Sequence, residues 1–230
     1  MGKYILSIET STQICSVAIH KNGALECLSE LYQENVHARK LMPLIEGLLD
    51  HGGIASAQLD AIAVSQGPGS YTGLRIGVST AKGLAYALDL PLLGVDTLKA
   101  MAHRLIGIVP QSAFVIPMID ARRMEVYTKV FQGSGEEVLP ISPVVLDEFS
   151  FRDYLEAGQV FFLGDAVEKV KSIIEHPHAH FVFKGTTADT VGKLAFEKFE
   201  NEDWEDLAYF EPNYLKEFRV IKSKKNPLLL

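Results

Sequence analysis

Short apolar runs separated by turn residues dominate the beginning of the chain. Residues 3–8 and 14–20 are apolar runs on either side of a polar turn that starts at Glu9. An Asn22-Gly23 pair, a strong hairpin signal, then leads into residues 24–31. The pattern therefore predicts three strands joined by turns.

Longer amphipathic segments follow and alternate with short apolar ones. Residues 35–51 carry a broad apolar face at helical spacing. After it the pattern predicts a strand at 59–65, a helix at 71–88, a strand at 92–95 and a helix at 96–106. Antiparallel strands followed by crossover helices indicate a mixed sheet covered by helices.

The second half repeats this order of elements. We expect strands at 113–119, at 124–131 and within 137–146, then a helix at 148–157, a strand at 160–163, a helix at 165–175, a strand at 181–184 and a helix at 188–201. The order is βββαβαβα in each half. It predicts an α/β protein with an N-terminal lobe (1–106), a C-terminal lobe (107–215) and a tail (216–230). This is the order of the actin-like (ASKHA) fold, a ribonuclease H-like duplication with a cleft between its lobes.

Charge and cysteine content narrow the class of protein. The 22 Lys and Arg against 29 Asp and Glu give a net charge of −7, which disfavours a globally basic nucleic-acid binder. Cys15 and Cys27 make no disulfide framework, and the N-terminus has no secretory pattern, so we expect a cytoplasmic protein. The segment 216–225 is basic, which is typical of a solvated end and leaves a weak tRNA contact open.

The strongest local motif is GPGSYTGLRIG at residues 67–77, between a predicted strand and a predicted helix. Glycines permit close backbone approach, and Ser70 or Thr72 can cap the helix. The helix N-terminus could then receive an anion, although the motif is not a Walker A loop. An ordinary tight strand-to-helix connection explains the same residues.

The full motif, followed by AKGLAYAL, resembles the TsaB (YeaZ) family. YILSIETST, HARKLMPLIEGLL at 37–49, Asp120-Ala121-Arg122, Gly164-Asp165 and Glu211-Pro212-x-Tyr214-Leu215 fit the same resemblance. It implies a role in making threonylcarbamoyladenosine in tRNA, at the adenosine beside the anticodon. It also implies a non-catalytic subunit that forms a heterodimer with TsaD, meets the ATPase subunit TsaE through that complex, contacts tRNA indirectly and can form a homodimer when alone.

The resemblance places the partner interface on the N-terminal helices. Gly73, Gly77, Ala81 and Ala85 recur every four residues and form a smooth stripe, which could let another helix approach. The alternative is that both helices pack only on their own sheet. The expected interface residues are Leu41, Leu44, Ile45, Leu48, Gly77, Ala81 and Leu84.

Catalytic alternatives rest on weaker patterns. TsaD-like proteins hold a metal with a His-x-x-x-His pair, but here His37 is followed by Leu41, which disfavours a glycoprotease-like, metal-dependent peptidase. His176, His178 and His180 could face one side of a strand, or lie in an exposed loop. An ATPase or kinase would need cleft carboxylates, and a nucleotide could bind in the cleft or at the partner interface. The cleft candidates are Glu9, Ser11, Gly69, Ser70 and Asp120.

Overall fold

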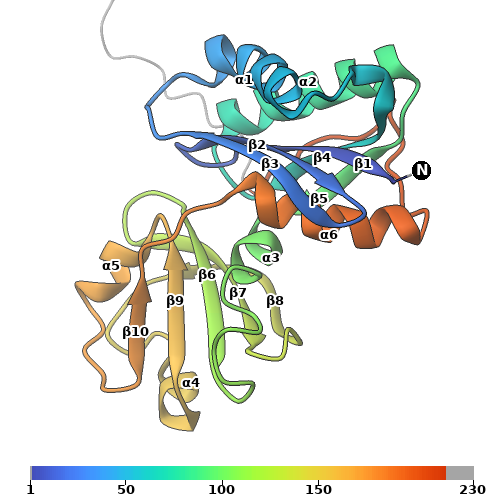
Figure 1. Cartoon of the computed structure of the whole chain (residues 1–230). Coiled ribbons are helices and arrows are strands. Elements are labelled where there is room, and N and C mark those ends of the chain that lie inside the picture. Colours follow the sequence, from blue (N-terminus) through green and yellow to red (C-terminus); the bar gives the residue numbers. More distant parts are fainter. Residues whose placement is uncertain (1, 216–230) are drawn as a thin grey trace, which may run out of the picture.

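The structure, a computed structural model, describes residues 2–215 and contains two five-stranded sheets, one above the other (Figure 1). The basic tail 216–230 lies outside the described residues. The first sheet, in the order β3-β2-β1-β4-β5, consists of β1 (Tyr4–Glu9), β2 (Cys15–Lys21), β3 (Ala24–Leu31), β4 (Leu59–Gly67) and β5 (Leu92–Asp96). The second, in the order β10-β9-β6-β7-β8, consists of β6 (Phe114–Asp120), β7 (Glu125–Gln132), β8 (Glu137–Val145), β9 (Val160–Gly164) and β10 (Ala179–Val182).

Both sheets have the same pairing. In the first, β1, β2 and β3 are antiparallel, whereas β4 and β5 run parallel to β1. In the second, β6, β7 and β8 are antiparallel, whereas β9 and β10 run parallel to β6. The predicted mixed sheets and the two-lobe duplication are confirmed.

The helices fall where the periodicity predicts them, but those expected at 96–106, 148–157 and 165–175 are shorter than predicted. They are α1 (His37–Gly52), the 3-10 turn η1 (Ser56–Gln58), α2 (Tyr71–Leu88), α3 (Thr97–Ala102), α4 (Arg152–Ala157), α5 (Val167–Lys171) and α6 (Ala188–Glu200). The helix expected at 148–157 begins only at Arg152. Phe151 before it has a φ of 64°, a left-handed conformation that an α-helix does not contain.

Helices α1 and α2 lie side by side on one face of the first sheet (Figure 1). Leu41, Ile45 and Leu48 of α1 are buried together with Val78 and Ala81 of α2. This packing uses the apolar arc of each helix, as expected for an amphipathic helix on a sheet.

Helices α3 and α6 do not follow the boundary at residue 106. Helix α6 comes last in the described sequence, yet Val191 and Leu194 pack under the first sheet against Ile5 and Leu93. Helix α3 precedes the second sheet and packs on it, as Met101 does against Leu163 and its neighbours. The division into 1–106 and 107–215 therefore separates the two sheets but not the helices that cover them.

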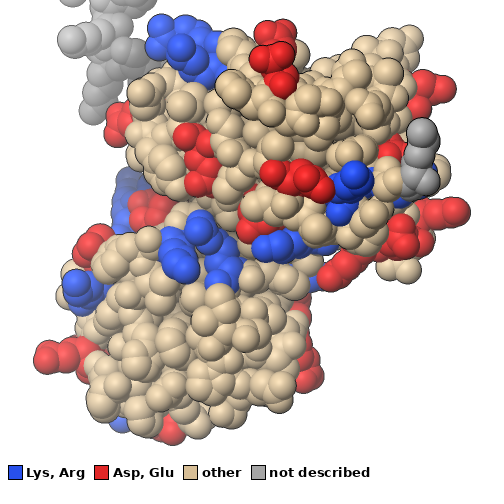
Figure 2. Space-filling view, viewed as in Figure 1, with Lys and Arg blue, Asp and Glu red and all other residues tan. Residues whose placement is uncertain are grey.

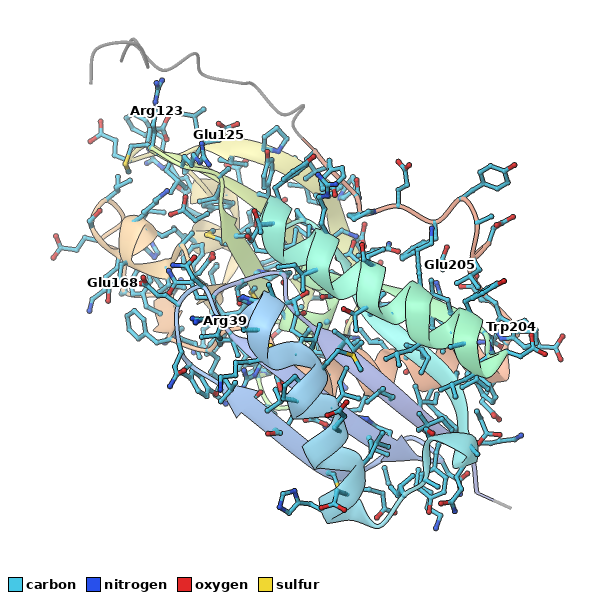
Figure 3. The ribbon with its side chains drawn as sticks, turned by 90° about the horizontal axis from the view of Figure 1, so that it is seen from above. Arg39, Arg123, Glu125, Glu168, Trp204 and Glu205 are labelled. Carbon is cyan, nitrogen blue, oxygen red and sulfur yellow. The ribbon has the colours of Figure 1, made fainter. Side chains whose placement is uncertain are left out.

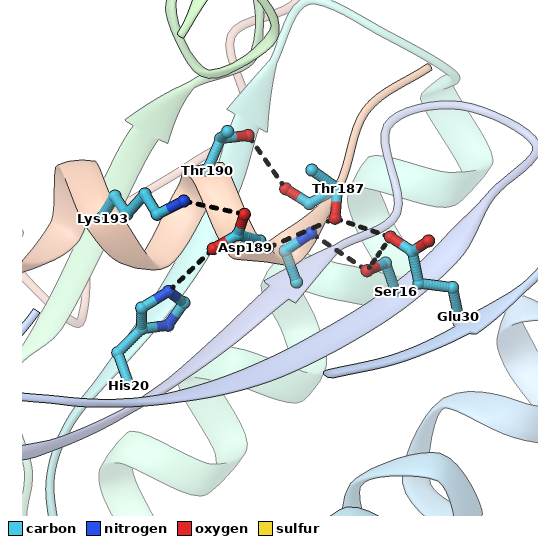
Figure 4. Close-up of polar contacts among 8 residues, drawn as sticks. Ser16, His20, Glu30, Thr187, Asp189, Thr190 and Lys193 are labelled. Atoms are coloured by element: carbon cyan, nitrogen blue, oxygen red, sulfur yellow. Dashed lines mark hydrogen bonds and ion pairs between the residues drawn. The ribbon is translucent and has the colours of Figure 1, made fainter. Parts of the chain in front are cut away.

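A polar network fixes the beginning of α6 on the first sheet (Figure 4). The Ala188 N–H donates to Ser16 Oγ (3.0 Å), and both Ser16 Oγ and Thr187 Oγ1 donate to Glu30 Oε1 (3.1 and 2.6 Å). At the next residue, Asp189 Oδ1 lies 3.3 Å from His20 Nε2. These bonds join α6 to β2 and β3, which lie far from it in the sequence.

Among residues 2–215, none of the helices combines the length and the apolar character needed to cross a membrane.

Candidate functional site

A cleft of about 1350 Å³ lies where the two halves meet. Its lining comes from the turn after β1, the start of α1, the loop before α2 with the first turns of that helix, the β6–β7 turn, Asp165 after β9 and the last described residues. These segments are far apart in sequence, and the duplicated fold brings them together.

The glycine-rich loop packs directly on the turn after β1. The Ser70 N–H donates to Ser11 O (2.6 Å), and a Cβ added at Gly69 would overlap Ser11. In α2, added Cβ atoms at Gly73 and Gly77 would overlap Thr10 O and Thr10 Oγ1. The glycines therefore let α2 approach this turn, which is the ordinary structural explanation of the motif.

Ser70 caps α2, as one of the two expected residues. Its Oγ accepts a hydrogen bond from the Gly73 N–H at 3.3 Å. The cap orients the N-terminus of an 18-residue helix toward the cleft, which Ser70, Tyr71 and Thr72 line.

Glu9 is buried next to the cleft rather than lining it. Its Oε1 accepts a hydrogen bond from the Ser11 N–H at 2.6 Å, and its side chain has no exposure. Burial raises the pKa of the Glu9 carboxyl, and contacts with Ser11, Ser65 and Thr186 offset part of that shift. The expectation that Glu9 lies in the cleft is therefore corrected, because the turn after β1 folds over its carboxyl.

Asp120 does line the cleft, as do Ser11, Gly69 and Ser70. Its carboxylate is engaged: Oδ1 accepts from Lys169 Nζ and from the Arg122 N–H, both at 2.6 Å. The Asp120 N–H donates in turn to Asp165 Oδ1 at 2.8 Å. Of the five cleft candidates, the structure brings four together and leaves Glu9 out.

Two features of the cleft were missed from the sequence. Arg122 and Arg123, which adopt left-handed backbone angles in the β6–β7 turn, are among the residues that line the cleft. The rings of Tyr71 and Tyr214 are in contact, with centroids 4.8 Å apart and planes tilted by 38°. Tyr214 belongs to the Glu211-Pro212-x-Tyr214-Leu215 motif, which was the only sign in the sequence that this residue lies at the site. Guanidinium groups near a helix N-terminus are groups of the kind that bind anions.

The histidines have structural contacts. His37 is buried, and its Nε2 lies 3.3 Å from Ile14 O. His178 Nδ1 lies 2.9 Å from Leu155 O, whereas His180 stacks on Phe161 with ring centroids 4.6 Å apart. His176 packs edge-on against His178. Within residues 2–215, no group of three or more His, Cys, Asp or Glu side chains is placed to hold a metal ion.

Most of the expected interface side chains point into the protein's own core. Those that are buried under α1 and α2 are Leu41, Ile45, Leu48, Gly77 and Ala81, and those that are half-buried are Leu44 and Leu84. The stripe from Gly73 to Ala85 faces the first sheet and the turn after β1. The interpretation of that stripe as an outward surface is corrected, because Gly73 and Gly77 accommodate Thr10 and the two alanines are buried in the core.

Comparison with known proteins gives a consistent set of relatives. The family model "TsaD: tRNA N6-adenosine threonylcarbamoyltransferase" matches residues 32–225. The tRNA threonylcarbamoyladenosine biosynthesis protein TsaB of Bacillus subtilis (strain 168) is 33% identical over 234 residues, covering 96% of this chain and 99% of that protein. TsaB of Haemophilus influenzae is 40% identical over 123 residues, which span 54% of this chain and about half (51%) of that protein.

Solved structures agree with these relatives. YeaZ from Pseudomonas aeruginosa has a TM-score of 0.79 and 31% identity, and the match covers 93% of this chain and all (100%) of that one. The activator of the 2-hydroxyisocaproyl-CoA dehydratase from Clostridium difficile with bound ADPNP has a TM-score of 0.50 and 9% identity, over 87% of this chain and 97% of that chain. The second likeness shows the fold alone. The sequence matches and the YeaZ structure together place this chain in the TsaB (YeaZ) family.

Proposed function

We propose that this protein is a non-catalytic subunit that acts with TsaD in the threonylcarbamoyladenosine modification of tRNA, at the adenosine beside the anticodon. Membership of the TsaB family supports the pathway, since the relatives of Bacillus subtilis and Haemophilus influenzae are named for it. A cytoplasmic location follows from a tRNA substrate.

The observation that carries the proposal is an exposed stripe of small residues on the outer face of α2. Ser79, Gly83 and Ala87 recur every four residues, and all three are exposed. An added Cβ at Gly83 would meet no atom within 4 Å. Figure 3, seen from above, has α1 and α2 on the outside of the molecule, with Arg39 at the start of α1 and Trp204 near the end of α2. A helix of TsaD, or of a second copy of this chain, could pack closely along this stripe.

The carboxylates support a non-catalytic role. Glu9 is buried beneath the turn after β1, and Asp120 is held by Lys169. A kinase-like or ATPase mechanism needs carboxylates that are free to hold Mg²⁺ and to orient a nucleophile. We therefore assign the transfer chemistry to TsaD, and contact with TsaE and most of the tRNA contact to the complex.

Gly83→Arg tests the proposed contact with TsaD. The new side chain projects from the exposed face, so the variant is expected to fold and to lose at least about tenfold in affinity for TsaD, because the bulky side chain separates the two helices. Isothermal titration with purified TsaD measures the affinity, and circular dichroism checks the fold.

Ala157→Arg is the matched control, because it adds the same side chain to an exposed position of α4 in the second half. It should bind TsaD like the wild type. Wild-type affinity for a folded Gly83→Arg variant would refute this surface as the contact.

A further inference from the structure

A row of basic side chains follows the junction between the two halves, on the side shown in Figure 2. The blue Lys and Arg side chains gather there above the second half and below the first. The row, here called the basic row, consists of Lys171 at the end of α5, Lys184 in the segment that leads to α6, Arg104 just after α3, Lys99 in α3 and Lys193 in α6.

Contacts between neighbours connect one end of the row. Lys171 Nζ lies over the Phe183 ring, 5.5 Å from its centroid, so it is close to the segment that carries Lys184. Arg104 Nη1 donates to Gly185 O at 2.6 Å, which fixes the guanidinium beside the same segment. The acceptor of this hydrogen bond is a neutral carbonyl, which does not offset the positive charge of Arg104.

His103 connects the other end. Burial lowers the pKa of the His103 imidazole, and the nearby charges of Lys99 and Lys193 lower it further, whereas Glu197 opposes them. Both lysines therefore lie within electrostatic reach of one ring, on two helices from different halves of the sequence. Helices α3 and α6 are in contact, and Arg104 follows His103 directly in the sequence, so the two ends of the row adjoin at the end of α3.

The charges of this row are largely uncompensated. Lys193 pairs with Asp189, but Lys99, Arg104, Lys171 and Lys184 make none of the ion pairs found among residues 2–215. Glu30 of β3, which accepts hydrogen bonds from the hydroxyls of Ser16, Tyr32 and Thr187, is an acid near the row, but among residues 2–215 it makes no ion pair with these cations. A protein of net charge −7 thus concentrates unpaired positive charge in one place.

Two exposed aromatic side chains border the row. Phe183 is 59% exposed beside Lys171, and Tyr32 is 71% exposed. The hydroxyl of Tyr32 is within electrostatic reach of Arg104. Cations that meet phosphates, next to aromatic rings on which bases can stack, are the combination that binds unpaired nucleotides of RNA.

We infer that the basic row is an RNA-binding surface, on which Lys and Arg contact backbone phosphates and Phe183 and Tyr32 stack on unpaired bases. The inference rests on the proposed function, since the RNA would be the tRNA that is modified. It goes further in giving this acidic subunit a direct contact of its own with the substrate. An acidic protein would also match the charge, but it would give the two aromatic rings no stacking partner.

The test is the salt dependence of tRNA binding by the complex of this full chain with TsaD. Each lost phosphate contact lowers the slope of log affinity against log salt by about one. Lys171→Ala/Lys184→Ala should therefore lower the slope by about two. Phe183→Ala should weaken binding about fivefold or more at every salt concentration, with the slope unchanged, because stacking is not electrostatic.

Lys3→Ala/Arg152→Ala is the matched control. It removes two positive charges as well, but from side chains that pair with Asp60 and Glu156 away from the row. It should keep the wild-type slope. A wild-type slope and affinity for Lys171→Ala/Lys184→Ala in an intact complex would overturn the inference, and so would a loss of TsaD binding in place of tRNA binding.

The same preparations separate this inference from the function on which it rests. If the wild-type complex modifies tRNA and the Lys171→Ala/Lys184→Ala variant binds it normally, the RNA-binding surface alone is refuted. If the wild-type complex neither binds nor modifies tRNA, the proposed function has failed.

Discussion

At the residue scale, the contact between Thr10 and the start of α2 explains the glycine-rich motif. Thr10 Oγ1 donates to Gly73 O at 2.8 Å, and an added Cβ at Gly77 would overlap that same hydroxyl. The sequence predicted the loop, the helix and a cap by Ser70 or Thr72, of which the structure has Ser70. It could not predict which face of α2 meets the turn after β1, because small residues at four-residue spacing suit any close contact.

This contact predicts opposite effects for two glycines of one helix. Gly77→Ala should lower the free energy of unfolding by roughly 1–3 kcal/mol, because the new methyl group overpacks against Thr10. Gly83→Ala should leave it unchanged or raise it by up to about 1 kcal/mol, because the site is open and Ala favours the helix. Urea denaturation of both variants measures the difference, and equal effects would contradict the packing described for α2.

At the element scale, the order of strands and helices follows from periodicity, but the partners of α3 and α6 do not. An amphipathic pattern shows that a helix has an apolar face without showing which sheet it covers. Leu194 packs on the first sheet and Met101 on the second, through contacts between distant parts of the sequence. The polar network at the start of α6 is equally non-local, since it joins Asp189 to His20.

The docking of α6 predicts a pH dependence through His20. Burial lowers the pKa of its imidazole, and the Asp189 carboxylate offsets only part of this shift. In the unfolded chain the imidazole takes up its proton near pH 6.5. The stability that neutral His20 contributes is therefore present above about pH 6.5 and is lost as the pH falls from there toward the folded pKa.

The free energy of unfolding of His20→Gln should consequently depend less on pH than that of the wild type, so the gap between the two should narrow from pH 7.5 to 5.5. Urea denaturation at each pH measures it. His103→Gln is measured in the same way, because burial lowers the pKa of the His103 imidazole as well. A gap that is constant with pH would contradict the buried, neutral state of His20.

At the scale of the whole molecule, two duplicated halves enclose a cleft that is lined by side chains from six separate segments. The sequence predicted the duplication and four of its cleft residues. It did not predict that Glu9 is buried, because the polar sequence of the turn after β1 is compatible with a carboxyl that is covered and with one that faces the cleft. It also missed the basic row, because Lys99, Lys171 and Lys184 are unremarkable until the fold aligns them.

The most direct test of the proposed function is the yield of threonylcarbamoyladenosine in a reaction reconstituted with TsaD, TsaE and tRNA, measured by mass spectrometry of digested tRNA. The account predicts that modification requires this chain, that Gly83→Arg abolishes it, and that Asp120→Asn preserves it, because Asp120 serves structure and TsaD the chemistry. Full modification without this chain, or loss of turnover by Asp120→Asn in an intact complex, would contradict the account.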